Sequence, residues 1–243
     1  SFYNVHGPIQ TTKALWEKYR EKAVNRPVAK TRFLIDRTTP VRQVQDNPLY
    51  AGMVEAMDDA VGMVLDTLDR LGLEDDTIVV FTSDNGGNIH TRLPEGGGIP
   101  VTSNSPLRGG KASMREGGVR VPTIVVWPGL TTPGSRSDEI IQTSDFYTTI
   151  LKGAGIPLPE NHPVDGIDIR PALRGQKLER DGIFTYFPCI VPVPEWLPPS
   201  MSVHSGDWKL VRVFHGGENG QHDYKLYDLS KDIGEVNNLA AAM

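Results

Sequence analysis

The chain has 243 residues, of which 25 are lysine or arginine and 30 are aspartate or glutamate, giving a formal net charge of −5. This balance leaves no basic surface of the kind that nucleic acid requires, so we expect no nucleic-acid partner. No apolar run approaches the roughly 20 residues of a membrane-spanning helix, and the only cysteine, Cys189, excludes an internal disulfide.

The elements predicted in the first part of the chain alternate between helix and strand. The segment from Thr12 to Ala29 is predicted to contain a surface helix that is ended by Asn25-Arg26-Pro27. A longer helix is predicted from Pro48 to Leu71, because apolar residues recur there at helical spacing and Gly72 can form the C-cap. The β-branched runs at residues 77–82 and 121–127 predict buried strands. Together they predict an α/β fold with a mostly parallel central sheet flanked by helices.

The later part of the chain has a different pattern. A short helix capped by Thr143 or Ser144 is predicted to end at Gly153. Beyond Gly175, short alternating runs divided by Gly, Pro and Asp predict a small antiparallel sheet. These runs cover residues 182–187, 201–204, 208–214 and 224–229. We therefore divide the chain into residues 1–175, part of an α/β domain, and residues 176–243, a small antiparallel subdomain whose last residues, 235–243, are predicted to form a truncated helix.

The strand at residues 77–82 runs into Asp84-Asn85-Gly86-Gly87. In open α/β sheets, ligands bind beyond the carboxyl ends of strands. Carboxylate and amide oxygens suit Ca²⁺ or Mg²⁺ rather than zinc, and the glycines allow other backbone to come close. The same residues are also common turn chemistry. From these residues alone, a metal site and a capped turn remain equal alternatives.

A second segment decides between these alternatives. It comprises Leu107-Arg108-Gly109-Gly110-Lys111 and, a few residues later, Glu116-Gly117-Gly118-Val119-Arg120-Val121-Pro122. With Ser83-Asp84-Asn85-Gly86 before them, these motifs resemble the sulfatase family of the alkaline phosphatase superfamily in type and order. Near the start, His6-Gly7-Pro8 is similar to the family's His-x-Pro element, although the family's middle residue is usually Thr.

The resemblance extends to the end of the chain. Trp208-Lys209-Leu210-Val211 and Lys225-Leu226-Tyr227-Asp228-Leu229 are similar to the family's C-terminal subdomain. It implies an alkaline-phosphatase-like fold, in which residues 1–175 are the C-terminal part of the catalytic α/β domain and residues 176–243 form the appended sheet.

The resemblance also implies roles for individual residues. Lys111 is expected to bind the sulfate and help the leaving group, and His6 to contact the sulfate and serve as proton donor, so both are candidate catalytic and substrate-binding residues. Asp84 and Asn85 match two oxygen ligands of the family's Ca²⁺, with Mg²⁺ the less favoured ion. Further candidate contacts to the alcohol part of the substrate are His90, Arg92, Arg115 and His204, for which a structural role is equally open. Arg108 and Arg120 are expected to brace the loop by salt bridges.

The nucleophile is missing from this set. Sulfatases use a formylglycine made from Cys or Ser in a Cys/Ser-x-Pro-x-Arg motif, and the chain has no such motif. Cys189-Ile190-Val191-Pro192 has the wrong spacing, and Asn104-Ser105-Pro106-Leu107-Arg108 begins with a residue that cannot become formylglycine. Family order places the nucleophile and further metal ligands upstream of Ser1. We therefore expect the chain to require the missing N-terminal part of the same protein and to be inactive alone.

The resemblance implies hydrolysis of sulfate monoesters, with a sulfated polysaccharide or glycosaminoglycan as substrate. It also implies an extracytoplasmic location, which can be periplasmic, lysosomal or secreted. Two alternatives stay open: a phosphate-ester or phosphonate hydrolase of the same superfamily, and a non-catalytic relative that binds sulfated glycans. The retained Asp84, Asn85 and Lys111 disfavour the binding protein, because a binder could keep its fold without metal ligands.

Overall fold

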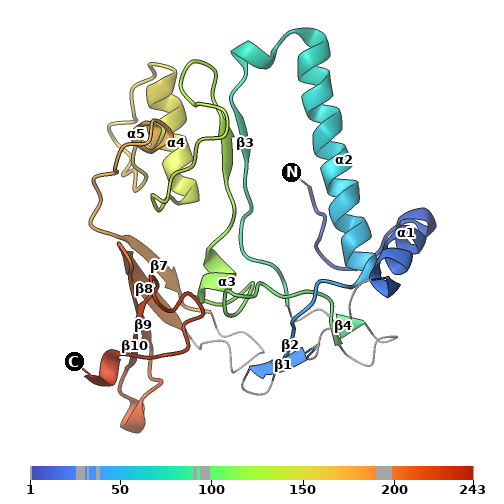
Figure 1. Ribbon diagram of the computed structural model, residues 1–243. Coiled ribbons are helices and arrows are strands. Elements are labelled where there is room, and N and C mark those ends of the chain that lie inside the picture. Colours follow the sequence, from blue (N-terminus) through green and yellow to red (C-terminus); the bar gives the residue numbers. More distant parts are fainter. Residues whose placement is uncertain are drawn as a thin grey trace.

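The computed structural model describes residues 2–25, 31, 33–36, 39–89, 92–93, 99–189 and 199–242. The helices are α1 (Lys13–Val24), α2 (Pro48–Leu71), α3 (Glu116–Val119), α4 (Thr143–Gly153) and α5 (Arg170–Leu173). The strands are β1 (Phe33–Asp36), β2 (Thr39–Arg42), β3 (Val79–Phe81), β4 (Arg92–Leu93), β5 (Ile99–Pro100), β6 (Ile124–Val126), β7 (Ile183–Phe187), β8 (Ser200–Ser205), β9 (Trp208–Val213) and β10 (Asp223–Asp228). In Figure 1, α2 stands on one side of β3 and the α4–α5 region on the other.

Capping residues determine where the two N-terminal helices begin and end. The side chain of Asn47 accepts a hydrogen bond from the Tyr50 N–H at 3.1 Å, and Gly72 adopts the left-handed conformation (φ 64°) that closes α2. Both predicted ends of α2 are confirmed. Helix α1 starts after its Thr12 N-cap and ends at Val24 with Asn25 as its C-cap, so the predicted stop at Asn25-Arg26-Pro27 is confirmed. No described helix has the length and apolarity needed to cross a membrane.

Strands β3 and β6 form the sheet that leads into the candidate site. Both lie at their predicted positions, and the α/β class is confirmed. Their pairing is antiparallel, with Val80 opposite Val125, and every strand pair in the described part of the chain is antiparallel. The predicted parallel arrangement is therefore not found among the described residues. The apolar run indicated burial on two faces but not the direction of the neighbouring strand. Ile124 and Val126 are 59% and 50% exposed, so one face is uncovered.

Helix α4 is confirmed, but its cap differs from the prediction. Gln142, rather than Thr143 or Ser144, is the N-cap, and its N–H donates to Asp145 Oδ2 at 2.8 Å in a capping box. The other oxygen of the buried Asp145 accepts from Arg180 at 2.6 Å and from the Ile167 N–H at 2.9 Å. One carboxylate thus starts the helix and fixes the loop that returns along it.

The C-terminal sheet has the predicted antiparallel form, with strand order β10-β9-β8-β7. Met114, which follows Lys111, packs in a buried cluster with Val211 and Val213 of β9. The sheet is therefore attached to the segment that carries the candidate lysine. The predicted final helix is wrong: only a 3-10 turn occurs, at Ala240–Ala242, and Glu235 adopts φ 52°, which a right-handed helix does not accommodate.

Candidate active site

The two motifs that predict the site are joined by main-chain hydrogen bonds. The Lys111 N–H donates to the Gly87 carbonyl at 3.1 Å, and the Gly86 N–H donates to the Gly118 carbonyl at 2.9 Å. The Gly117 N–H donates to the Arg108 carbonyl at 2.7 Å, which closes residues 108–117 into a loop that we call the Lys111 loop. The turn that carries Asp84 and Asn85 therefore lies directly against the loop that carries Lys111.

Glycine is required for this contact. A Cβ atom added at Gly86 would lie 1.7 Å from the Gly117 oxygen, and one added at Gly110 would lie 2.5 Å from the Gly87 oxygen. No real Cβ approaches an oxygen so closely, so a side chain at either position forces the two segments apart. The glycines that the motifs contain thus act through close backbone approach rather than through turn formation.

Asn104 is a site residue that sequence reasoning missed. Its Nδ2 lies within hydrogen-bonding distance of three carbonyl oxygens: Gly87 at 3.0 Å, Gly109 at 2.9 Å and Gly117 at 3.0 Å. It therefore connects the Asp84 turn to both ends of the Lys111 loop. From the sequence, Asn104 resembled only the spacing of a nucleophile motif. The signal that could have found it is an amide donor beside a glycine-rich stretch, whose exposed carbonyls need partners.

The Asp84 turn offers hard oxygen ligands. Asp84 is exposed and Asn85 is half-buried. Asn85 Nδ2 donates to the Gly86 carbonyl at 3.0 Å, which leaves its Oδ1 as the atom that a cation can bind. These donors fit Ca²⁺ or Mg²⁺. Among the described residues, no group of three or more His, Cys, Asp or Glu side chains is placed to hold a metal, so this pair would supply only part of a coordination sphere.

Lys111 is half-buried, and neither it nor Asp84 forms an ion pair with another residue in the described part of the chain. His6 lies in the exposed N-terminal segment, where its Nδ1 is 3.0 Å from the Gly7 carbonyl oxygen. That segment is anchored by Ile9, which packs with Met53 and Val101. The structure thus brings Lys111 to the Asp84 turn, while no hydrogen bond joins His6 to either of them among the described residues.

The remaining candidate substrate contacts lie in different places. His90 is outside the described residues, and Arg92 belongs to β4, with its side chain outside the description. Arg115 is 3% exposed and donates to Tyr227 Oη at 2.7 Å and to the Glu235 carbonyl at 3.4 Å. The guanidinium therefore forms hydrogen bonds within the protein interior, and the predicted contact with substrate does not fit this geometry.

His204 lies on β8 and is half-buried, opposite Lys209 of β9. Burial lowers the pKa of its imidazole, and the nearby Glu116 carboxylate opposes that change. Its substrate role remains a prediction. By contrast, the salt bridge expected for Arg120 is confirmed, since its guanidinium lies 3.6 Å from Glu116 Oε2. Arg108 also braces the loop, but its contact with Glu235 is a hydrogen bond to the backbone carbonyl at 3.0 Å rather than a salt bridge.

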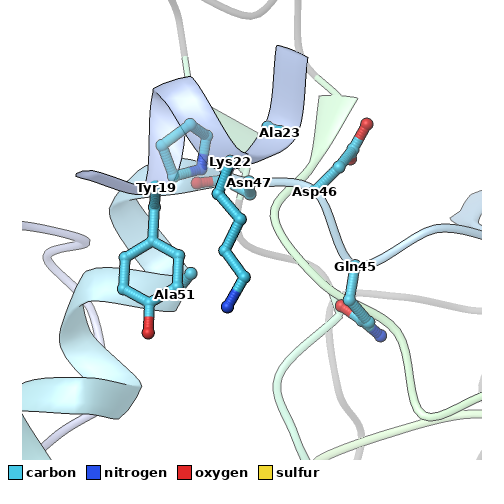
Figure 2. Close-up of a pocket in the computed structure, with 8 residues that line it drawn as sticks. Tyr19, Lys22, Ala23, Gln45, Asp46, Asn47 and Ala51 are labelled. Atoms are coloured by element: carbon cyan, nitrogen blue, oxygen red, sulfur yellow. The ribbon is translucent and has the colours of Figure 1, made fainter. Parts of the chain in front are cut away.

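A small pocket lies between α1 and the start of α2 (Figure 2). Figure 2 shows Tyr19 and Lys22 of α1 beside Gln45, Asn47 and Ala51, with the Lys22 ammonium between Tyr19 and Gln45. The pocket contains none of the residues predicted for the active site. It carries no assignment here.

Substituting Gly86 by alanine in the full-length protein is expected to destabilise the fold by more than the about 1–3 kcal/mol of ordinary overpacking, because the obstructing atom is backbone. The matched control is Gly62→Ala in α2, where an added Cβ meets nothing within 4 Å. That change is expected to cost much less than Gly86→Ala, because alanine favours a helix and no described residue fills the space beside Gly62. Thermal unfolding of both variants tests this. Equal melting temperatures for Gly86→Ala and the unmodified protein would contradict it.

The Sulfatase family model matches residues 1–156, and the model described as N-sulphoglucosamine sulphohydrolase, C-terminal, matches residues 110–243. The chain therefore belongs to the sulfatase family. It is 35% identical over 213 residues to the steryl-sulfatase of Homo sapiens, an alignment that covers 80% of this chain and 36% of that protein. The chain spans about a third of the length of this and other curated relatives that it matches.

Solved structures agree with this membership. The structure of Ps i-CgsB in complex with k-i-k-neocarrahexaose superposes with a TM-score of 0.72 at 25% identity, covering 98% of this chain and 44% of that chain. A second, of a protein in complex with its substrate D-glucosamine-2-N,6-O-disulfate, gives a TM-score of 0.61 at 25% identity over 80% of this chain and 36% of that chain.

Proposed function

We propose that the protein to which this chain belongs hydrolyses sulfate monoesters, and that Lys111, Asp84 and Asn85 are part of its active site. The observation that carries the proposal is the 3.1 Å hydrogen bond from the Lys111 N–H to the Gly87 carbonyl. It brings the residue that carries the ammonium next to the turn whose oxygens we propose as metal ligands. A sulfate group needs this combination, because charge must be stabilised on its nonbridging oxygens during ester cleavage.

Lys111 and His6 have separate roles in this proposal. The half-buried Lys111 ammonium donates to the nonbridging sulfate oxygens, where partial exclusion of water strengthens the interaction. His6 supplies the proton that the departing alcohol requires. Because a carbonyl oxygen can only accept, Nδ1 is the donor in the contact with Gly7, which leaves Nε2 as the ring nitrogen available to the substrate.

Asp84 and Asn85 would hold a Ca²⁺ ion, which supplies Lewis-acid polarisation of the bound sulfate. Calcium is favoured over magnesium because it accepts irregular sets of six to eight oxygens, whereas magnesium demands near-octahedral geometry. The two residues provide a minority of such a set. The remaining ligands would come from another part of the protein.

We propose that this other part is an N-terminal region that also supplies the formylglycine nucleophile. The chain's coverage of only about a third of its curated relatives supports this. So do large apolar side chains left uncovered on α2 and β6, including Met63 at 71%, Val64 at 53% and Ile124 at 59% exposure. Apolar surface of this kind is what a further portion of a domain covers.

The isolated 243-residue chain is expected to show no turnover of an aryl sulfate, because it has no Cys/Ser-x-Pro-x-Arg motif to form the nucleophile. The full-length protein, assayed with Ca²⁺ in parallel, is expected to turn over the same compound. Ordinary turnover by the isolated chain would contradict the proposal. Turnover of the aryl phosphate analogue is measured in parallel. A full-length protein that turns over the phosphate faster than the sulfate is a phosphate-ester hydrolase instead.

For the substrate, we propose a sulfated carbohydrate. Two solved structures that resemble the chain hold a carrahexaose and a glucosamine disulfate. The human relative is a steryl-sulfatase, so the alcohol part varies among relatives. We propose an extracytoplasmic location for the same reason, because sulfated polysaccharides occur outside the cytoplasm. Desulfation of carbohydrate and steryl sulfates by the full-length protein, measured side by side, decides between these classes.

A further inference from the structure

Four charged side chains meet in a buried group between α3 and the C-terminal sheet, which we call the α3 cluster. Glu116 and Glu235 are 0% exposed, Lys209 is 1% and Arg115 is 3%. Lys209 Nζ lies 2.7 Å from Glu116 Oε1 and 3.3 Å from Glu235 Oε1, and Arg115 lies 3.9 Å from Glu235 Oε1. The two acids and two bases balance in charge. In Figure 1, α3 lies beside the sheet formed by β7 to β10.

The α3 cluster attaches a loop to a sheet at a large desolvation cost. Buried ions lose their hydration, and well-packed apolar residues of similar size are often at least as stabilising. The chain already joins the same elements with apolar contacts, because Met114 packs on Val211 and Val213. An ionic cluster restricts the loop and the sheet to one relative position, because moving either one leaves a buried charge without its partner.

Glu235 holds both ends of the Lys111 loop. At one end, its carbonyl oxygen accepts a hydrogen bond from Arg108 at 3.0 Å. At the other end, its carboxylate Oε2 accepts from the Glu116 N–H at 2.7 Å, and its carbonyl also accepts from Arg115 at 3.4 Å. Lys111 lies between these two attachment points. The family match to residues 110–243 likewise includes most of the loop, Lys111 among it, together with the sheet.

We propose that Glu235 is a positioning residue for Lys111, so that the C-terminal sheet sets the place of the Lys111 ammonium relative to Asp84 and Asn85. This inference rests on the proposed function. The rate of an enzyme depends steeply on such placement, and a misplacement of about 1 Å can cost about 100-fold. Glu235 touches neither substrate nor metal in this role. It acts through the two ends of the loop.

The first test replaces Glu235 in the full-length protein. Glu235→Ala removes the acceptor of the Glu116 N–H and is expected to lower kcat for an aryl sulfate by about 10- to 100-fold with a smaller change in KM, because loss of transition-state stabilisation appears in kcat. Glu235→Gln keeps an acceptor oxygen and is expected to restore most of kcat. The control is Asp223→Ala, which breaks a half-exposed ion pair with Lys225 (2.7 Å) on the same sheet and is expected to leave kcat unchanged.

The second test combines Glu235→Ala with Lys111→Ala. If Glu235 acts through Lys111, its substitution is expected to change kcat less than about threefold once Lys111 is already absent, because residues that act as a unit are not additive. If the kcat losses of the two single variants multiply in the double variant, the inference is overturned. So would a Glu235→Ala protein that loses folded fraction but keeps the kcat of each folded molecule.

Failure of this inference differs from failure of the proposed function. If Lys111→Ala keeps full sulfatase activity, the proposed function fails. If Lys111→Ala loses activity while Glu235→Ala keeps it, only the positioning role fails. Should Glu235→Ala not fold, Arg108→Met carries the same test, because it releases the other attachment of the loop and leaves the α3 cluster intact. An unchanged kcat in that variant would overturn the inference.

Discussion

Replacing Lys111 by alanine in the full-length protein is expected to lower kcat for an aryl sulfate by about 100- to 1,000-fold, the usual loss when one donor to a developing oxyanion is removed. The ammonium is half-buried and has no ion-pair partner among the described residues, so it is available to an anion. Its position is fixed by the hydrogen bond from its own N–H to Gly87. The side chain can therefore be removed while the backbone contact stays.

Steady-state kinetics on an aryl sulfate measures this effect. Lys177→Ala is the matched control, because Lys177 is exposed on a loop distant in sequence from the site. It is expected to keep kcat and KM. Lys111→Arg retains the charge but not the compact ammonium, and is expected to recover only part of the rate. An undiminished kcat in Lys111→Ala would remove Lys111 from the active site.

Replacing Asp84 by alanine is expected to weaken Ca²⁺ binding to the full-length protein by at least about 100-fold, since changes merely beside a metal ligand already cost 10- to 100-fold. Sulfatase activity is expected to fall with it and to recover partly at high Ca²⁺. The physical reason is that Asp84 supplies the only charged oxygen of the Asp84-Asn85 pair.

Calorimetric titration of the metal-depleted protein with Ca²⁺ measures the affinity directly. Asp58→Ala is the control, because Asp58 is an exposed acid on α2, away from the Asp84 turn in the sequence. Its Ca²⁺ affinity should equal that of the unmodified protein. Equal affinity in Asp84→Ala would instead make the Asp84 turn a structural cap, the alternative that turn chemistry alone allows.

Features set by neighbouring residues were predictable from the sequence. Helix α2 has both expected ends because Asn47, Pro48 and Gly72 act within a turn of the helix. The C-terminal strands were predictable because alternation and turn residues are local signals. The direction of the β3–β6 pair was not predictable, since an apolar run carries no information on the direction of its neighbour.

Features set by distant partners were missed. Glu116 bonds Lys209 across 93 residues and Glu235 across 119 residues, so no local pattern marks these acids and bases as buried. The same contact explains the missing final helix, because Glu235 turns away (φ 52°) to reach α3. Arg115 was a candidate contact to the alcohol part of the substrate, with a structural role equally open, because its partners Tyr227 and the Glu235 carbonyl are more than a hundred residues away in the sequence.

The most direct test of the site is a crystal structure of the full-length protein with Ca²⁺ and a bound sulfate monoester or its analogue. We expect a sulfate oxygen at about 3 Å from Lys111 Nζ and a metal bound at about 2.3–2.6 Å by Asp84 and Asn85 oxygens. A sulfate bound elsewhere, with Lys111 and Asp84 free of both ligand and metal, would contradict the assignment of this site.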